Sequence, residues 1–276
     1  MRRFSAEYLT RTRDGMWEDS TAALSALSLG DRDRILDVGC GTGELTQTLS
    51  VEATAQQTTP PLVVGVDADR SLLDVAQRQT NGQYVQGDAF RLPFATDSFD
   101  LVVCQALLIN LPDPQVAVEE FARVSSDLVA AIEPNNAQVG VTSTVREEAE
   151  LEQTVRDAFL RGVETDVALG DTVQTLFEQV GLRNRSTTRY HHKKRIEPPY
   201  SAAALADAKA KATGSGLQKH DLEIKSGLAG SEPNMGYDTL RSKWRSMGRD
   251  VIDQMQTEEY RRIELVPFDV TVGRVL

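Results

Sequence analysis

The sequence contains few of the residues on which disulfide-stapled and metal-stapled proteins depend. Among its 276 residues there are only two cysteines, Cys40 and Cys104, and three histidines. Neither cysteine belongs to a CxxC pair, and neither has a histidine nearby at the spacing of a metal site. We therefore expect no disulfide framework, no structural zinc and no other metal site.

Long apolar runs are also missing. The longest, LVVCQALLI at 101–109, is much shorter than the roughly 18 residues that a membrane-spanning helix requires. The first residues, MRRFSAEYLTRTRD, lack the apolar core of a signal peptide. The sequence therefore predicts a cytoplasmic protein without a membrane span, and its apolar share of 40% is enough for a packed core.

Positive charge is scarce, and lysine is rare. The chain has 7 lysines and 23 arginines against 41 acidic residues, which gives a net charge of −11. Such a surface repels polyanions, so a nucleic-acid partner is disfavoured. A composition poor in lysine and rich in acids is typical of proteins adapted to high salt, but an ordinary acidic protein looks similar, and the sequence leaves both open.

Short β-branched runs alternate with helical patterns from about residue 33 to residue 190. The runs read RILDV, PLVVGV, QYVQG, FDLVVCQ and DLVAAIE. Alternation of this kind predicts an α/β fold with a parallel sheet and right-handed crossovers. Between the first two runs, the polar segment VEATAQQTTPP at 51–61 is expected to be a surface loop.

The flanking segments complete the predicted organisation. Residues 1–32 form an N-terminal helical cap, 33–199 the core, 200–260 a helical insertion or lid, and 261–276 a final strand that returns to the core sheet. Inside the insertion, apolar residues recur at helical spacing: Leu240, Trp244, Met247, Val251 and Met255. We expect this stripe to pack a helix onto the domain.

The run ILDVGCGTGELT at 35–46 combines a buried strand with closely spaced glycines. Such a loop lets a ligand approach the backbone, and the next helix offers free N–H groups. The dinucleotide pattern GxGxxG does not fit, because its third glycine would fall at Glu44 or at Thr46. A carboxylate at Glu44 would also repel a pyrophosphate, so the loop suits a ligand without phosphate.

The segment DVGCGTG resembles the glycine motif of class I S-adenosylmethionine-dependent methyltransferases. Further parts of that pattern follow in order: VVGVD, QGDAFRLPF, FATDSFDLVV and LPDPQVAVEEFARV. The resemblance covers about residues 33–133 and is closest to the small-molecule branch that includes the quinone-biosynthesis enzymes. It implies a Rossmann-like, doubly wound sheet of seven strands, with the helical insertion between the last two.

The resemblance also implies a set of cofactor-binding residues. In that family, the acid at Asp67 binds the ribose hydroxyls, the acid at Asp88 accepts from the adenine amino group, and Asp37 anchors the loop and assists the methionine amino group. The full expected set for S-adenosylmethionine is Asp37, Gly39, Gly41, Gly43, Asp67, Ala68, Asp88, Ala89 and Gln105.

No catalytic base can be carried over from the family. Where some small-molecule enzymes have a histidine pair, this chain reads LLINL, and the KPGG-type turn before the fifth strand is replaced by RVSSDLVAAIEP. The candidates for a base are Glu133, Tyr8 and His191. The basic cluster RYHHKKR at 189–195 is either a solvated edge strand or an attractant for an anionic ligand.

These patterns predict methyl transfer to a small or medium-sized metabolite. Two alternatives stay open at this point: an RNA or protein methyltransferase, and a non-catalytic module that binds S-adenosylmethionine. The sequence does not define the acceptor, the atom methylated or the oligomeric state.

Overall fold

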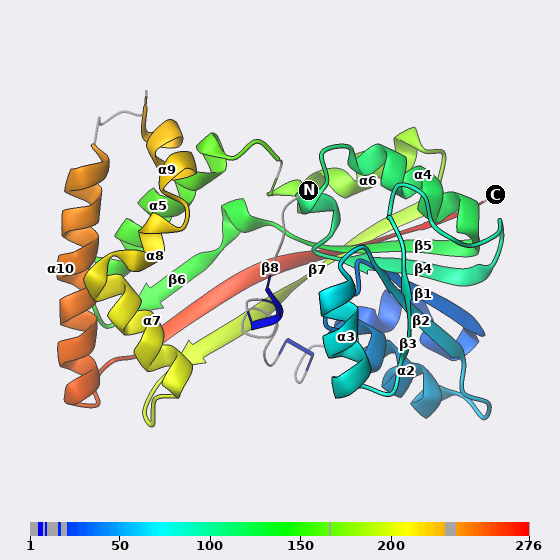
Figure 1. Cartoon of the computed structure of the whole chain (residues 1–276), viewed down its shortest axis with the longest axis horizontal. Helices are drawn as coiled ribbons and strands as arrows, with labels where there is room; N and C mark the ends of the chain where they lie inside the picture. The colour runs from blue at the N-terminus through cyan, green and yellow to red at the C-terminus, as the bar shows by residue number, and fades with distance from the viewer. Residues whose placement is uncertain are drawn as a thin grey trace. The chain divides into compact units, whose positions relative to one another are not determined.

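The computed structural model describes residues 5–7, 9, 16, 17, 21–165, 167–229 and 236–275. The chain divides into two compact units (Figure 1). The first unit comprises residues 1–135, 169–190 and 268–276, and the second comprises residues 136–168 and 191–267. Strands β7 (Arg183–Ile196) and β8 (Arg262–Arg274) contribute residues to both units.

The first unit is built on a sheet in which the strand order is β3-β2-β1-β4-β5-β8. The strands β1 to β5 are Arg34–Val38, Leu62–Asp67, Gln83–Gln86, Phe99–Gln105 and Ser125–Pro134. They pair in parallel, whereas β8 is antiparallel to β5. The order reverses between β1 and β4, and in open α/β sheets ligands bind at the carboxyl ends of the strands at such a point.

Helices cover both faces of this sheet (Figure 1). They are α2 (Glu44–Gln56), α3 (Arg70–Gln79), α4 (Pro114–Val124) and α6 (Val173–Gln179). The apolar sides of α4 and α6 share one core cluster with Val38, Val102 and Val129 of the strands, and α2 and α3 lie over the opposite face. Helix α4 begins as its sequence predicts, because the carboxylate of Asp113 accepts a hydrogen bond from Val116 N and Pro114 occupies the first turn.

Short 3₁₀ turns complete the first unit. They are η1 (Thr21–Leu27), η2 (Leu29–Asp31), η3 (Leu108–Asn110) and η5 (Leu169–Thr172). The turns before β1 are fixed to the sheet by Arg32, whose guanidinium donates to the carboxylate of Asp127 at 2.5 Å and to the carbonyl of Leu27. Arg32 therefore joins the segment directly ahead of β1 to β5.

The second unit joins one short strand to a set of helices. Strand β6 (Gly140–Ser143) pairs antiparallel with the first residues of β8. The turn η4 (Asn136–Gln138) precedes it, and the helices are α5 (Glu148–Gly162), α7 (Ala202–Thr213), α8 (Ser215–Gln218), α9 (Asp221–Leu228) and α10 (Tyr237–Gln256). The stripe predicted on α10 is buried among them.

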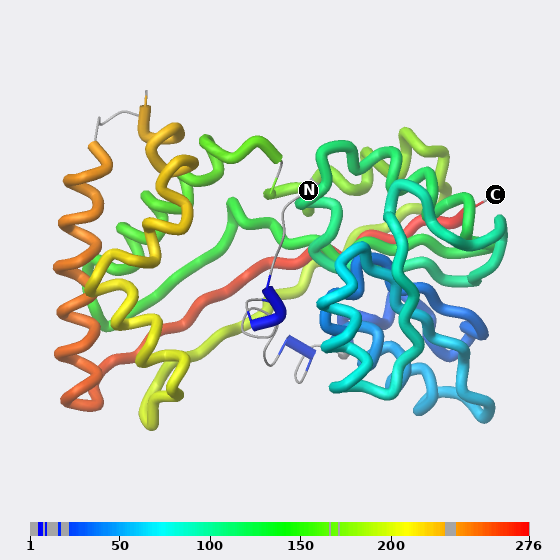
Figure 2. Tube along the Cα trace, viewed as in Figure 1, coloured from blue at the N-terminus to red at the C-terminus, as the bar shows by residue number. Residues whose placement is uncertain are grey.

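Close helix packing in this unit depends on glycine. Helices α7 and α10 run side by side (Figure 2), and a Cβ at Gly248 of α10 would lie only 2.3 Å from Ala212 N of α7. In the same way, a Cβ at Gly162 of α5 would lie 1.8 Å from the carbonyl oxygen of Glu223 in α9. Larger side chains at these two positions would force the helices apart.

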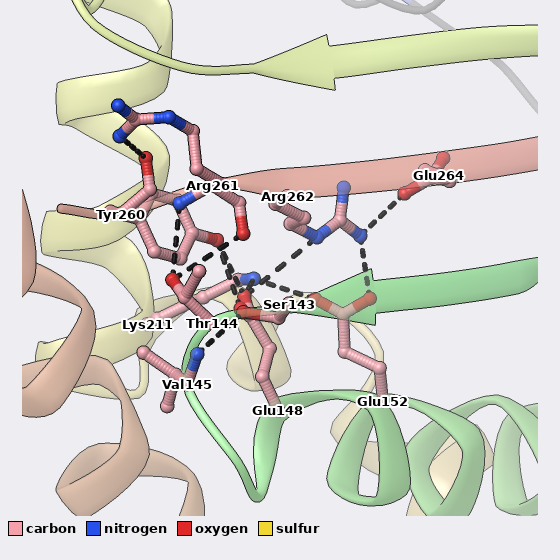
Figure 3. Close-up of polar contacts among 10 residues, drawn as sticks. All are labelled: Ser143, Thr144, Val145, Glu148, Glu152, Lys211, Tyr260, Arg261, Arg262 and Glu264. Carbon is pink, nitrogen blue, oxygen red and sulfur yellow. Dashed lines mark hydrogen bonds and ion pairs between the residues drawn. The ribbon is translucent and has the colours of Figure 1, made fainter.

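A buried network of charged groups crosses the second unit (Figure 3). Glu148 is fully buried and accepts from Tyr260 Oη at 2.9 Å, from Ser143 Oγ and from Lys211 Nζ. Glu152, one turn further along α5, accepts from Lys211 Nζ and from Arg262 Nη2, both at 2.6 Å. The network therefore links α5, α7 and β8.

The structure confirms the predicted α/β class, the doubly wound sheet and the helical insertion between the last two long strands. It differs in two respects. Strand β6 is an eighth strand that the sequence pattern does not show. The segment expected as a loop at 51–61 is helical as far as Gln56, because Leu49 and Ala53 bury one side of α2. In the compact units given above, residues 136–168 and 191–199 cluster with the insertion. Among the described helices, none has the length and apolar character that crossing a bilayer requires.

Candidate functional site

The glycine loop connects β1 to α2 at the reversal of the strand order. Gly39, Gly41 and Gly43 all have positive φ, at 71°, 56° and 87°. This conformation is costly for residues with a Cβ. A Cβ at Gly39 would lie 2.8 Å from a methyl carbon of Leu107, and one at Gly43 would lie 2.3 Å from the hydroxyl of Tyr84. Both conformation and space therefore require glycine in this loop.

Asp67, the last residue of β2, fastens this loop. One of its carboxylate oxygens accepts from Gly41 N at 2.9 Å, and the other accepts from Asp69 N at 2.8 Å. The loop is also held by Gly39 N, which donates to the carbonyl of Val66 at 2.7 Å. Asp67 is only partly buried, and a carboxylate has about four acceptor positions, so it keeps capacity for further donors.

Asp37 lies beneath the loop. Its side chain is 1% exposed, and its carboxylate accepts from Thr46 Oγ1 of α2 at 2.6 Å. The contact joins the end of β1 to the first turns of α2. Sequence reasoning singled out Asp37 but not its partner Thr46, because a threonine inside a helix carries no motif.

The residues after β2 and β3 lie on the same edge of the sheet. Ala68 is exposed, and its carbonyl accepts from Gln86 Nε2 at 3.1 Å. Asp88 is exposed as well and accepts from Phe90 N at 3.0 Å, whereas Ala89 is buried. Asp88 thus occupies an open turn at the carboxyl end of β3.

Gln105 ends β4 and is 3% exposed. Its Nε2 lies 2.8 Å from Met16 Sδ, and its Oε1 is buried without a hydrogen-bond partner in the described part of the chain. The next residue, Ala106, has a positive φ of 47°, which turns the chain sharply out of the sheet. The end of β4 is therefore in contact with the segment that precedes the first strand.

Glu133, a candidate base, is fully buried near the end of β5. One carboxylate oxygen accepts from Leu107 N at 3.0 Å and from Leu108 N at 2.9 Å. Burial raises the pKa of Glu133 to about 7, although these backbone donors act in the opposite direction. Its contacts make Glu133 a support for the turn after β4.

The other two candidates for a base lie outside the described part of the first unit. His191 is exposed and belongs to the second unit, and Tyr8 lies outside the described residues. The side chains of the basic cluster at 189–195 are not all solvated. Arg189 forms a two-point ion pair with the buried Asp269, at 2.7 Å for both contacts, and His192 is buried.

An aromatic cluster in the first unit was not predicted. The ring of Tyr190 stacks on Phe268 at 5.7 Å and lies 6.1 Å from the ring of Trp17. Tyr190 Oη and Trp17 Nε1 are buried and have no hydrogen-bond partner among the described residues. Trp17 directly follows Met16, the contact of Gln105, so the cluster adjoins the end of β4.

Known proteins are similar to this chain over part of its first half, which contains the glycine loop. Residues 36–127 match the family model described as a methyltransferase domain. The demethylmenaquinone methyltransferase of Lactiplantibacillus plantarum is 36% identical over 115 residues, which is 39% of this chain and 46% of that protein. The enzyme of the same name from Staphylococcus aureus (strain MRSA252) is 40% identical over 97 residues, 33% of this chain and 38% of that protein.

The solved structures extend the likeness of fold. The YcgJ protein of Bacillus subtilis has a TM-score of 0.52 at 16% identity, with 92% of this chain and 97% of that chain covered. A protein of Bacillus halodurans C-125 has a TM-score of 0.51 at 16% identity, with coverage of 93% and 98%. At these identities the likeness concerns the fold alone.

The chain matches less than half the length of these curated relatives. The matched part includes the glycine loop, Asp67 and Asp88, and it ends before the insertion. The chain therefore resembles the class I S-adenosylmethionine-dependent methyltransferases, and its residues 36–127 match the methyltransferase domain model and are similar to the demethylmenaquinone methyltransferases.

Proposed function

We propose that this protein transfers a methyl group from S-adenosylmethionine to a small-molecule acceptor. The observation that carries the proposal is the glycine loop fastened by Asp67 at the carboxyl ends of β1 and β2. The glycines let the loop adopt its turns against Leu107 and Tyr84, and Asp67 keeps acceptor positions for a pair of hydroxyls. Glu44 in the first turn of α2 opposes a phosphate and favours a cofactor that has none.

Each cofactor contact is assigned from its position. Asp67 binds the ribose hydroxyls, and Asp88 in its exposed turn accepts from the adenine amino group. Asp37, held by Thr46, fixes the loop near the methionine amino group. Gly39, Gly41 and Gly43 give the loop the conformation in which its backbone contacts the cofactor, while Ala68, Ala89 and Gln105 border it.

The acceptor is placed beside Gln105 and the aromatic cluster of Trp17, Tyr190 and Phe268. Stacked rings with buried polar atoms suit a flat, largely apolar molecule that carries a hydrogen-bonding group. The sulfonium of the bound cofactor supplies an already activated methyl group. The protein then contributes alignment, worth roughly 7 to 11 kcal/mol in favourable cases, and exclusion of water.

The first test is the affinity for S-adenosylhomocysteine, measured by titration calorimetry. The variant Asp67→Asn keeps one oxygen for the loop but loses the negative charge that the ribose hydroxyls require, so we expect binding at least tenfold weaker. Asp74→Asn on α3 is the matched control, because Asp74 pairs with Arg70 at the surface. An unchanged affinity in Asp67→Asn would remove the ribose assignment.

The second test separates the remaining functions. Tritiated S-adenosylmethionine is supplied with small-molecule, RNA and protein fractions of a cell extract. Label that enters the small-molecule fraction supports the proposal, whereas label in RNA or protein replaces it with a macromolecular methyltransferase. Cofactor binding without transfer to any fraction indicates a non-catalytic module.

A further inference from the structure

Helix α10 presents three arginines on one side. Arg241, Arg245 and Arg249 follow one another at intervals of four residues, which places their side chains along one face. Together with Asp238 and Ser242 they line a hollow of about 430 Å³. We call this hollow the α10 arginine site.

These arginines have no carboxylate partner among the described residues. Like charges four residues apart destabilise a helix unless something neutralises them. In the same unit, Lys211 and Arg262 are each paired with buried carboxylates, whereas the partly buried Arg241 and the exposed Arg245 and Arg249 have no such pairing among the described residues. With 41 acidic residues available in the sequence, three unpaired arginines around one hollow point to a ligand from outside the chain.

The surroundings of Arg241 support the same conclusion. Its Nε is buried and has no hydrogen-bond acceptor within the described chain. The turn at Gly214, between α7 and α8, borders the arginines, since a Cβ there would lie 3.2 Å from Arg245 Cγ and 3.3 Å from Arg241 Nε. A buried guanidinium nitrogen without an acceptor is costly, and an anionic oxygen in the hollow would remove that cost.

We propose that the α10 arginine site binds a small anion that carries two or three phosphate or carboxylate groups. The volume of the hollow lies in the range of small-molecule sites, roughly 300 to 1,000 Å³. The three arginines span about 12 Å along the helix, further than one anionic group reaches. Guanidinium groups also bind phosphate and carboxylate oxygens in pairs. A nucleic acid is disfavoured because the net charge of −11 repels an extended polyanion.

The test is titration calorimetry of the full chain with tripolyphosphate, and with citrate as the carboxylate probe, in low-salt buffer. We expect Arg245→Gln to weaken binding at least tenfold and Arg241→Gln/Arg245→Gln to abolish it. Lys243→Gln removes a charge from the same helix outside the lining, so it is expected to change the affinity less than twofold. Asp238→Asn removes the one negative charge in the lining and is expected to tighten binding. The preferred probe identifies phosphate or carboxylate as the natural group.

Three outcomes would overturn the proposal. They are the absence of binding by either probe to the folded wild-type protein, equal weakening by Lys243→Gln and Arg245→Gln, and tighter binding of an RNA oligonucleotide than of tripolyphosphate. The α10 arginine site shares no residue with the glycine loop. Affinity for S-adenosylhomocysteine is expected to be unchanged in Arg245→Gln, so failure of one proposal leaves the other intact.

Discussion

Among single residues, Glu133 has the clearest consequence for pH dependence. Burial raises its pKa from 4.5 to about 7 in the folded protein. Between these two pH values the folded state binds more protons than the unfolded state, so stability falls as the pH rises. The full stability contribution is present below pH 4.5 and is lost above pH 7. The gap between the two pKa values corresponds to about 3 kcal/mol.

The variant Glu133→Gln removes this titration while its amide oxygen still accepts from Leu107 N and Leu108 N. We expect the variant to be more stable than the wild type at pH 8, by about 2 to 3 kcal/mol, and nearly equal to it at pH 4.5. Urea unfolding at the two pH values measures the difference. Glu119→Gln on the exposed side of α4 is the control. A difference between wild type and Glu133→Gln that does not vary with pH would contradict the assignment.

Single site residues could be predicted from the sequence where they belong to a local motif. Gly39, Gly41, Gly43 and Asp67 could be identified because their spacing follows directly from a strand, a turn and a helix. The cluster of Trp17, Tyr190 and Phe268 could not be identified, since its members are about 80 to 250 residues apart and meet only after folding. The sequence also could not predict that the α10 arginines lack carboxylate partners among the described residues, because ion pairing depends on side-chain positions.

Among the structural elements, the charge network of the second unit joins α5, α7 and β8 (Figure 3). Removing one member of a buried ion pair leaves the other uncompensated, which typically costs about 3 to 5 kcal/mol. Glu148→Gln removes the carboxylate that accepts from Tyr260 and one of the two that pair with Lys211, which keeps Glu152, so we expect a loss of stability of about 3 kcal/mol. Glu150→Gln, on the exposed side of the same helix, is expected to change stability by less than about 0.5 kcal/mol.

The measurement uses Trp244 as a local probe. Trp17→Phe leaves Trp244 of α10 as the single tryptophan, and its buried ring reports on the second unit. Fluorescence-detected urea unfolding then follows this unit in each variant. Lys211→Met/Glu148→Gln is expected to recover part of the loss, because both charges are removed together. Strictly additive losses would show that the two side chains do not interact.

The sequence predicted elements best where apolar residues recur at a clear period. The strands β1 to β5, the capped start of α4 and the stripe on α10 follow from such patterns. Strand β6 did not, because GVTS is too short and too polar to show alternation. The end of α2 was missed because Ala53 is buried by tertiary packing, which outweighs the polar character of 51–56.

At the scale of the whole molecule, the net charge determines how stability depends on salt. A net charge of −11 destabilises the compact state through self-repulsion, and added salt screens that repulsion over a Debye length of about 3 Å at 1 M. We therefore expect the melting temperature at pH 7.5 to rise by roughly 5 °C between 0.1 M and 1 M KCl. A much larger rise would favour adaptation to high salt over an ordinary acidic surface.

Near pH 5, close to the sequence pI of about 4.9, the net charge vanishes and the salt effect is expected to disappear. An equal rise at both pH values would contradict charge repulsion and assign the effect to exclusion of salt from the protein surface.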